Sequence, residues 1–449
     1  MKVAFVSLGC AKNLVNTEQM MALCRDAGHI VTGDPEGADV AVLNTCGFIE
    51  SAKSEAINSI LELAELKKAG KLKKLLVAGC LTQRYREEIR TELPEVDGML
   101  GTGSYTDVVQ AVEELMAGER PEHFGRMDRA YDDGERMVTT PPYTAYLKIA
   151  EGCSNGCAFC IIPKLRGRYR SRSMDQLLRE ARELEERGVK ELIVIAQDIT
   201  RYGIDLYHKR MLGELLTELC KLPFHWIRLH YLYPDELDDD LIEVIASEPK
   251  ILKYIDIPLQ HINDGILKRM CRRSTKAEIL ALLAKLRDRL PGLVLRTSLI
   301  CGLPGEGKAE FEELCEFLRE YLAGKYDEID LAGFSLEVSI PERPVFCALD
   351  QLQFRRVLDN LLSNALRHNR LGTVLFFDVA ISGTQVLLRV GDNGAGIPPE
   401  RARHIFDPFV VGSDARSGKG SGLGLAITRR IVEKHGGTVD LADRPAPGR

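Results

Sequence analysis

The sequence contains no run of the roughly 20 apolar residues that a membrane-spanning helix requires, so no membrane contact is expected. Its first residues, KVAFVSLGC after Met1, lack the long apolar core and the small-residue cleavage site of a signal peptide. The net charge of −6 is not the basic excess of a protein that coats nucleic acid, so no direct nucleic-acid readout is expected. A cytoplasmic location follows, where thiols stay reduced. The twelve cysteines are therefore predicted to be metal ligands or buried apolar residues and not disulfides.

With 449 residues, the chain is long enough for two or three domains. Its first hundred or so residues alternate short apolar runs with helical patterns, which predicts an α/β domain with a parallel sheet. Cys10, Cys46 and Cys80 each follow one of these runs, so they are expected at the carboxyl edge of the sheet, where ligands bind. Ligation is the favoured interpretation of these three cysteines. The alternative, a small buried apolar residue, fits better the cysteines within helical patterns, Cys24, Cys220, Cys271 and Cys315.

A second group of three cysteines lies in a short loop, EGCSNGCAFC, at a CxxxCxxC spacing. The loop follows the first of five apolar runs that alternate with helical segments over residues 143–320, which predicts a barrel or half-barrel of parallel strands. A structural zinc site uses four protein ligands, and a redox CxxC motif uses two. Cys153, Cys157 and Cys160 instead suit a cubane iron–sulfur cluster whose fourth iron stays open to another ligand. Phe159, inside the triplet, is expected to shield the cluster from water.

These motifs resemble the radical S-adenosylmethionine superfamily, in which an aromatic residue precedes the last cysteine of a CxxxCxxC loop. SLGCAKNLVNTE, NTCGFIESAKSEAI, VAGCLTQRY and CAFCIIPKLRGRYRSR resemble more narrowly its methylthiotransferases. AKN and IIPKLRGRYRSR favour the branch that modifies an aspartate of ribosomal protein S-twelve over the transfer-RNA branch. The resemblance runs from Met1 to about Glu320. It implies replacement of an unactivated C–H bond by C–S–CH₃, with two 4Fe-4S clusters, S-adenosylmethionine, a ribosomal protein substrate and an electron donor such as flavodoxin or ferredoxin.

The resemblance also implies roles for individual residues. It implies an auxiliary cluster, which holds the sulfur to be donated, on Cys10, Cys46 and Cys80. It implies a radical-generating cluster on Cys153, Cys157 and Cys160. The implied contacts to S-adenosylmethionine are Phe159 and, from the motif GLPGE, Gly302, Gly305 and Glu306. Four polar residues on expected strands either line the barrel near the cofactor or are hydrogen-bonded core groups: Gln197, Asp198, Gln260 and Arg296.

Beyond about Glu320 the chain carries a different ordered series of motifs. An amphipathic helix with two asparagines four residues apart precedes DNGAG, then F-x-x-F, then the glycine-rich GKGSGLGL. Amides on one helix face suit Mg²⁺, and glycine-rich N–H groups before a helix suit phosphate. The series resembles the ATP-binding catalytic domain of sensor histidine kinases. This resemblance implies Mg-ATP bound by Asn360, Asn364, Asp392, Gly394, Gly396, Gly420, Gly422 and Gly424, with Phe406 and Phe409 matching the phenylalanine box and Gly418 the start of the lid.

Three domains are therefore expected. They are a parallel-sheet domain with the auxiliary cluster over 1–135, a partial (β/α) radical S-adenosylmethionine barrel over 140–320, and an α/β sandwich of the histidine kinase ATPase type over 325–449. EIDLAGFSLEV fits the first strand of the third domain better than the open barrel edge. The last barrel strand, the small docking domain of the methylthiotransferases and the final kinase strand are not recognised. No histidine lies between His261 and His368 to accept a phosphoryl group.

Three interpretations remain open. The first is a methylthiotransferase with a nucleotide-binding appendage. The second is a kinase-type phosphotransfer protein with a sensory or vestigial cluster domain. The third is a joining of two unrelated proteins near residues 320–333, in which neither activity is complete. The complete set of six cysteines favours the first interpretation for the chemistry, and the third is preferred for the origin of the chain.

Overall fold

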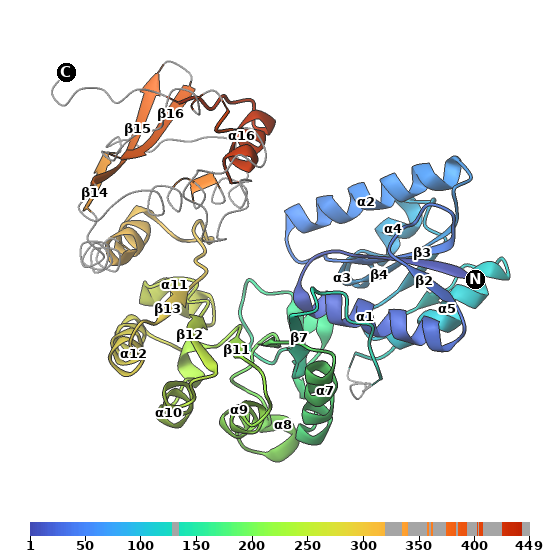
Figure 1. Cartoon of the computed structure of the whole chain (residues 1–449), viewed down its shortest axis with the longest axis horizontal. Coiled ribbons are helices and arrows are strands. Elements are labelled where there is room, and N and C mark those ends of the chain that lie inside the picture. Colours follow the sequence, from blue (N-terminus) through green and yellow to red (C-terminus); the bar gives the residue numbers. More distant parts are fainter. Residues whose placement is uncertain are drawn as a thin grey trace. The chain divides into compact units, whose positions relative to one another are not determined.

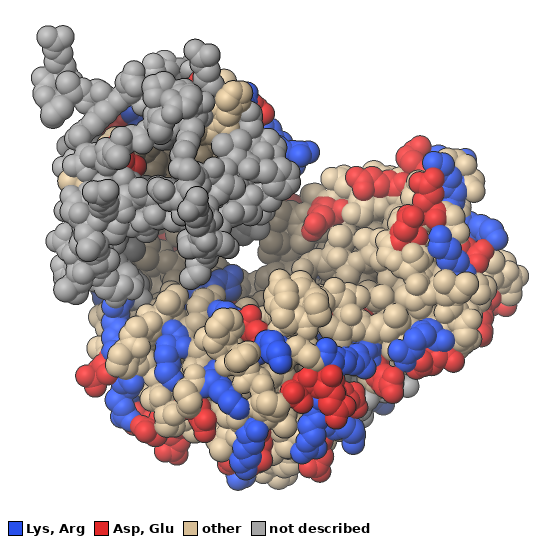
Figure 2. Space-filling model, viewed as in Figure 1, with Lys and Arg blue, Asp and Glu red and all other residues tan. Residues whose placement is uncertain are grey.

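The computed structural model describes residues 1–127, 134–318, 335–339, 357–358, 361, 374–382, 385–392, 402, 404–406 and 424–441. The chain forms two units, Met1–Leu314 and Cys315–Arg449 (Figure 1). Within the described residues, no helix is both long enough and apolar enough to cross a membrane. Figure 2 shows Lys and Arg side chains interspersed with Asp and Glu over one face of the first unit, so this face carries no extended patch of one sign.

The first unit begins with a six-stranded parallel sheet in the order β2-β1-β3-β4-β5-β6. Its strands are β1 Lys2–Ser7, β2 Ile30–Thr32, β3 Ala38–Thr45, β4 Leu72–Gly79, β5 Gly98–Leu100 and β6 Glu122–His123. The helices are α1 Ala11–Asp26, α2 Glu50–Lys68, α3 Cys80–Arg84, α4 Arg86–Glu92 and α5 Val108–Met116, with a 3-10 turn at Tyr105–Asp107. The central strands are almost wholly apolar because α1 and α5 cover one face and α2 covers the other. The predicted parallel-sheet domain is confirmed.

A five-stranded parallel sheet follows, in the order β13-β12-β11-β10-β7. Its strands are β7 Thr144–Lys148, β10 Glu191–Ile195, β11 Trp226–Leu229, β12 Ile251–Asp256 and β13 Val294–Arg296. The helices are α6 Ile162–Arg166, α7 Met174–Glu186, α8 Ile204–Tyr207, α9 Leu212–Cys220, α10 Asp239–Ser247, α11 Asp264–Arg269 and α12 Lys276–Arg289, with a 3-10 turn at Pro234–Glu236. Capping boxes at Ser173 and Thr275 begin α7 and α12. The partial barrel predicted from five strand–helix repeats is confirmed (Figure 1).

Buried ion pairs join the two sheets of the first unit. Glu18 on α1 accepts hydrogen bonds from Arg136 at 3.0 Å and from the Thr139 N–H at 2.7 Å. The Arg136 guanidinium also contacts Glu180 on α7, with Nε 2.9 Å from a carboxylate oxygen. Glu18 and Arg136 are almost fully buried, so each charge depends on its partner for the interactions that water would otherwise supply. The network fixes α1 against the barrel, and with α1 the turn that carries Cys10.

The second unit contains a three-stranded sheet in the order β14-β15-β16. β14 Ser335–Ser339 pairs in parallel with β15 Val374–Ser382, and β15 pairs in antiparallel with β16 Gln385–Asp392. The segment SLEVS therefore belongs to the second unit and not to the barrel edge, as the sequence predicts. The helix expected after the glycine-rich segment is α16, Gly424–Lys434.

Candidate functional site

Cys10, Cys46 and Cys80 lie at the carboxyl ends of three neighbouring strands, where the sequence places them. Cys10 is the N-cap of α1 after β1, Cys46 directly follows β3, and Cys80 begins α3 directly after β4. Because β3 pairs with both β1 and β4, the three cysteines stand side by side at one edge of the sheet. The negative charges of Cys80 and Cys10 both raise the pKa of Cys46, after the larger effect of burial, so the three thiols are within electrostatic reach of one another.

Two glycines let these backbone segments approach closely. Gly9 has a φ of +85°, and a Cβ placed on it would lie 2.5 Å from the Cys46 Cβ and 3.2 Å from its Sγ. Gly79 has a φ of +102°, and its Cβ would lie 2.5 Å from the Thr45 carbonyl oxygen. No other residue fits either position without displacing the turn beside a cysteine. The edge therefore suits a bulky group held by three thiolates, which is what an iron–sulfur cluster requires.

Buried cations around the auxiliary cysteines favour the thiolate form. Burial alone would raise the pKa of Cys10, but the charges of Lys12 and Arg166, together with N–H donors of α1, lower it below its ordinary value. Asn13 fixes the same turn, since its side-chain amide donates to the carbonyls of Leu8 at 3.1 Å and Thr45 at 2.9 Å. The thiolate is the form that binds a metal, so this charge distribution suits ligation.

Cys153, Cys157 and Cys160 lie in the loop between β8, Ala150–Glu151, and α6. The loop is closed by hydrogen bonds from the Cys153 N–H to the Gly167 carbonyl and from the Cys160 N–H to the Cys157 carbonyl, both 3.1 Å. Burial raises the pKa of Cys153 to about 11, and Cys160 and Cys157 add to the effect. The three side chains therefore face a common region, and a positively charged metal group there would have to offset the cost of forming buried thiolates.

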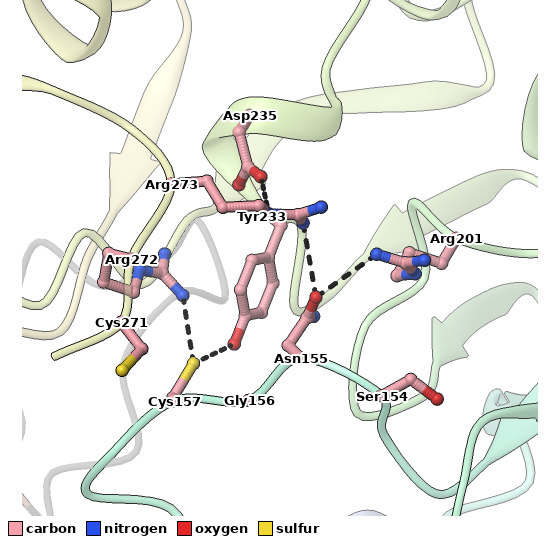
Figure 3. Close-up of a pocket in the computed structure, with 10 residues that line it drawn as sticks. All are labelled: Ser154, Asn155, Gly156, Cys157, Arg201, Tyr233, Asp235, Cys271, Arg272 and Arg273. Carbon is pink, nitrogen blue, oxygen red and sulfur yellow. Dashed lines mark hydrogen bonds and ion pairs between the residues drawn. The ribbon is translucent and has the colours of Figure 1, made fainter. Parts of the chain in front are cut away.

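A small cavity of about 110 Å³ opens beside Cys157 (Figure 3). The Tyr233 hydroxyl lies 3.3 Å from the Cys157 Sγ, and the Arg272 guanidinium donates to the same sulfur at 3.9 Å. Arg272 also stacks on the Tyr233 ring, 4.2 Å from its centroid. Hydrogen bonds and charge at a ligand sulfur stabilise the thiolate and tune the group that it binds. The cavity is lined by Ser154, Asn155, Gly156, Cys157, Arg201, Tyr233, Asp235, Cys271, Arg272 and Arg273.

Within the described part of the chain, no three His, Cys, Asp or Glu side chains are arranged to hold a single metal ion. In a cubane each cysteine binds a different iron, so the ligands stand farther apart than those of a single ion.

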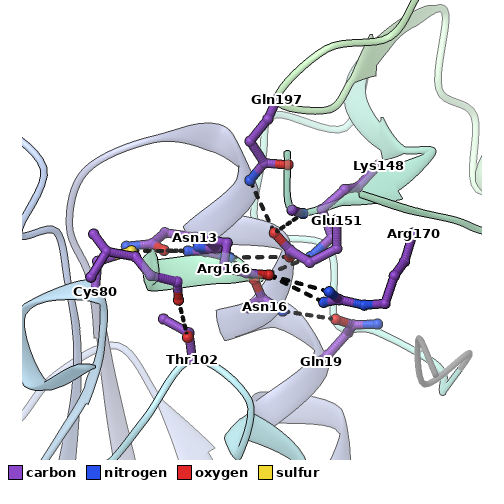
Figure 4. A network of polar contacts seen from close by, with 12 residues as sticks. Asn13, Asn16, Gln19, Cys80, Thr102, Lys148, Glu151, Arg166, Arg170 and Gln197 are labelled. Atoms are coloured by element: carbon purple, nitrogen blue, oxygen red, sulfur yellow. Dashed lines mark hydrogen bonds and ion pairs between the residues drawn. The ribbon is translucent and has the colours of Figure 1, made fainter. Parts of the chain in front are cut away.

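Arg166 connects the barrel to the auxiliary cysteines (Figure 4). It ends α6, only six residues after Cys160, and its buried guanidinium donates to the Cys80 Sγ at 3.4 Å. The same group donates to the side chains of Asn16 and Glu151, each at 3.1 Å, and to the side-chain oxygen of Asn13. One short helix thus begins near one cysteine set and ends on the other.

Glu151 is the buried anion of this network. Lys148 contacts its carboxylate at 2.9 Å, Arg166 contacts it at 3.1 Å, and the Gln197 side-chain amide donates to it at 2.9 Å. Burial alone would raise the pKa of Glu151, but Lys148 and Arg166 hold it well below its ordinary value. The network in Figure 4 is therefore charged at neutral pH and ties the barrel loop to α1.

The other polar residues singled out in the barrel have partners in the structure. Asp198 is buried and accepts from the side chain of Asn155 at 2.7 Å, which matches the hydrogen-bonded core alternative. Arg296 pairs with Asp256 at 2.8 Å. Gln260 has a φ of +72° and bridges to the segment after β13 through its backbone.

The GLPGE loop follows β13. Gly302 and Gly305 have φ values of +79° and +89°, which glycine adopts without strain. The Glu306 carboxylate accepts from the Leu303 N–H at 3.0 Å and lies 3.5 Å from the buried His261 ring. Phe159 is half-buried beside Cys160. The contacts of these residues with S-adenosylmethionine remain predictions.

Most of the predicted nucleotide site lies outside the described residues. Asp392 ends β16 and Gly424 begins α16, where the sequence places them, and Phe406 lies in a turn. The residues outside the described ranges are Asn360, Asn364, Gly394, Gly396, Phe409, Gly418, Gly420 and Gly422.

Sequence reasoning missed Arg166, Lys148, Glu151 and Tyr233. Arg166 lies in the segment RGRYRSR, and the local sequence pattern does not distinguish this buried arginine from the exposed Arg168. A signal existed for Glu151, because a carboxylate directly after an apolar strand and two residues before a cysteine needs a buried cation.

Three family models match the chain. Residues 2–101 match the uncharacterized protein family UPF0004, residues 147–318 match the radical SAM superfamily, and residues 349–449 match the histidine kinase-, DNA gyrase B- and HSP90-like ATPases. The third match agrees with the predicted α/β sandwich at the C-terminal end.

Curated relatives cover most of the chain. A protein of Lachnoclostridium phytofermentans described as ribosomal protein uS12 methylthiotransferase RimO is 50% identical over 343 residues, which are 76% of this chain and 77% of that protein. A protein of the same description from Caldanaerobacter subterraneus subsp. tengcongensis is 52% identical over 337 residues, 75% of this chain and 76% of that protein. Among solved structures, the radical S-adenosylmethionine methyltransferase TsrM from Kitasatospora setae matches with a TM-score of 0.55 at 13% identity, over 71% of each chain. That likeness supports the fold alone.

Proposed function

Because the chain belongs to the RimO family of ribosomal protein uS12 methylthiotransferases, we propose that it replaces one C–H hydrogen of an aspartate side chain in uS12 by a methylthio group. The observation that carries the proposal is the presence of two complete cysteine triads, one at the carboxyl edge of the first parallel sheet and one in the loop that follows β7 and β8. Family membership supplies the reaction class, and the triads are the residues that such a reaction needs.

We assign the two triads to two 4Fe-4S clusters. Cys10, Cys46 and Cys80 would hold the auxiliary cluster, and the glycine-lined edge around them fits a bulky group. The loop with Cys153, Cys157 and Cys160 would hold the radical-generating cluster, with S-adenosylmethionine at its open iron. When bound, the clusters and S-adenosylmethionine supply the hydrogen-abstracting radical, the sulfur and the methyl group.

The residues of the chain itself supply position, charge and exclusion of water. Arg166 donates to Cys80 while its own helix follows Cys160, so the two triads keep a fixed separation. The ion pairs of Glu18 and Arg136 hold α1 against the barrel. Cys80, Cys153 and Cys157 are each less than 10% exposed, so part of each ligand set is shielded from water, while Cys10, Cys46 and Cys160 are partly exposed. Radical chemistry needs this shielding, because an open site would quench a reactive carbon centre.

We expect the reconstituted full-length chain to methylthiolate a uS12 peptide that carries the target aspartate. The peptide, S-adenosylmethionine and a chemical reductant are mixed under anaerobic conditions, and the product is analysed by tandem mass spectrometry. The peptide is used at high concentration, since a docking domain is not recognised in the sequence. The expected product carries one methylthio group on the aspartate. A peptide with alanine at that position should remain unmodified. Cleavage of S-adenosylmethionine without any sulfur-containing peptide would contradict the proposed function.

We propose a reduced flavodoxin or ferredoxin as the electron donor, because a single electron must enter the barrel cluster for each radical formed. Thiolate-held clusters also need a reducing compartment, which supports the cytoplasm as the location. We further propose domain limits of 1–135, 140–320 and 325–449. The boundary between the two units at Leu314 and the ranges of the matched families support this division.

A second proposed function, nucleotide binding, belongs to the C-terminal domain. The match over residues 349–449 and the position of Asp392 at the end of β16 support Mg-ATP as the ligand. We expect Asp392→Asn to weaken binding of a fluorescent ATP analogue by about ten- to a hundredfold, because a hydrogen bond to a charged group contributes about 1.5–3 kcal/mol. The control is Asp378→Asn, whose carboxylate pairs with Arg389 at 2.9 Å on the strand surface. Equal binding by Asp392→Asn and the unaltered chain would refute this site.

A further inference from the structure

Lys12 is a buried cation two residues after Cys10. It lies in the first turn of α1 and is only 7% exposed. Its ammonium lies 3.5 Å from the centroid of the Tyr231 ring, which it faces across the boundary between the two sheets of the first unit. A cation over an aromatic ring is stabilised, but the ring supplies no hydrogen-bond acceptor of its own.

Lys12 differs from three other buried cations of this region in having no carboxylate partner. Lys148 and Arg166 share Glu151, and Arg136 pairs with Glu18. Within the described residues, the Lys12 ammonium forms no ion pair with a carboxylate. The Cys10 thiolate is the anion nearest to Lys12 in the sequence, but no carboxylate pairs with the ammonium, so the geometry leaves it able to accept a carboxylate from outside the chain.

Tyr231 holds the position of Lys12 relative to the barrel. It follows β11 at the carboxyl end of the barrel sheet, where a substrate is expected, and its φ is +67°. A non-glycine residue in this region of backbone space is strained, and such strain concentrates at functional positions. The Ile199 N–H donates to the Tyr231 carbonyl at 3.1 Å and fixes this conformation. Lys12 stands two residues after Cys10 and faces the Tyr231 ring after β11, so its ammonium lies between the auxiliary triad and the barrel strands.

We propose that the Lys12 ammonium binds the carboxylate of the substrate's target aspartate, with the Tyr231 ring as its platform. The inference rests on the proposed function and names the residue that selects the substrate. An aspartate entering between the triad and the barrel brings a carboxylate, the partner that the Lys12 ammonium lacks. An asparagine of the same shape offers only a neutral carbonyl, which accepts a weaker hydrogen bond from an ammonium. Lys12 is thus a specificity-determining residue for a carboxylate over an amide.

The test compares two uS12 peptides, one with the target aspartate and one with asparagine in its place. Binding to the reconstituted full-length chain is measured by fluorescence anisotropy, and kcat/KM is measured for the aspartate peptide. We expect the unaltered chain to bind the aspartate peptide about ten- to a hundredfold more tightly than the asparagine peptide. Lys12→Gln should lose this preference, and Lys12→Arg should keep most of it. Lys12→Met, with similar length and no charge, should behave like Lys12→Gln.

The matched control is Lys53→Gln. The Lys53 ammonium also faces a tyrosine ring, 5.4 Å from the centroid of Tyr85, but it pairs with Glu50 at 2.7 Å. Replacement of Lys53 should therefore leave the preference for the aspartate peptide unchanged. Iron content and thermal unfolding are recorded for every variant. Retention of the aspartate preference by folded Lys12→Gln and Lys12→Met overturns the inference. If these variants keep the preference but lose iron at the auxiliary triad, Lys12 is a counter-ion of the cluster instead. Failure of the unaltered chain to bind or modify the aspartate peptide would refute the proposed function itself.

Discussion

Replacement of Cys153, Cys157 and Cys160 by alanine should abolish reductive cleavage of S-adenosylmethionine and, with it, all modification of uS12. The loop that carries these residues offers no fourth cysteine, so loss of the three thiolates leaves no ligand set for the barrel cluster. 5′-Deoxyadenosine formation, measured by liquid chromatography under anaerobic conditions, should fall to the level of protein-free solution. No acid or base of the chain can replace a radical in breaking an unactivated C–H bond.

The control for this variant is Cys220→Ala. Cys220 ends α9, is 8% exposed and belongs to neither triad, so its loss should leave 5′-deoxyadenosine formation within about twofold of the unaltered chain. Continued cleavage of S-adenosylmethionine by the triple variant would show that these cysteines do not hold the radical-generating cluster.

Replacement of Cys10, Cys46 and Cys80 by alanine should separate the two halves of the reaction. The barrel triad remains intact, so 5′-deoxyadenosine still forms, while the peptide gains no sulfur. The donated sulfur is expected to come from the auxiliary cluster at the sheet edge formed by β1, β3 and β4, and this variant lacks the ligands of that cluster. The readout is the ratio of methylthiolated peptide to 5′-deoxyadenosine, which should fall to zero within detection.

Cys24→Ala is the control for the auxiliary triad. Cys24 lies in α1, the helix that begins directly after Cys10. It is fully buried among apolar residues, and its core cluster contains no other cysteine. The substitution costs some packing but should leave the product ratio unchanged. Transfer of sulfur by the auxiliary triple variant at an undiminished ratio would remove these cysteines from the mechanism.

The sequence was sufficient to place both triads at strand ends because the pattern around each cysteine is local. An apolar run followed by a turn and a helix fixes the direction of each strand, and parallel strands end at the same edge. The adjacency of β1, β3 and β4 is a long-range property, yet it was not needed to predict that their carboxyl ends share an edge. The same reasoning predicts the five barrel strands, whereas SLEVS is assigned to the second unit by its fit to the first strand of the kinase-type domain, which the pairing of β14 with β15 confirms.

The charged residues around the triads were not predictable in this way. Arg166 lies 86 positions from Cys80 in the sequence, and only the fold brings its guanidinium to that sulfur. Lys12 belongs to the motif AKN, which identified a family branch but gave no indication that its ammonium is buried against Tyr231. Side-chain partners across two sheets depend on tertiary packing, which no local pattern encodes.

The central claim is that two separate cysteine triads each hold an iron–sulfur cluster, and counting iron and acid-labile sulfide per chain tests it most directly. Anaerobically reconstituted, desalted protein should contain about eight of each, and either triple-alanine variant should contain about four. A content of about four in the unaltered chain, or of about eight in either variant, would contradict the account.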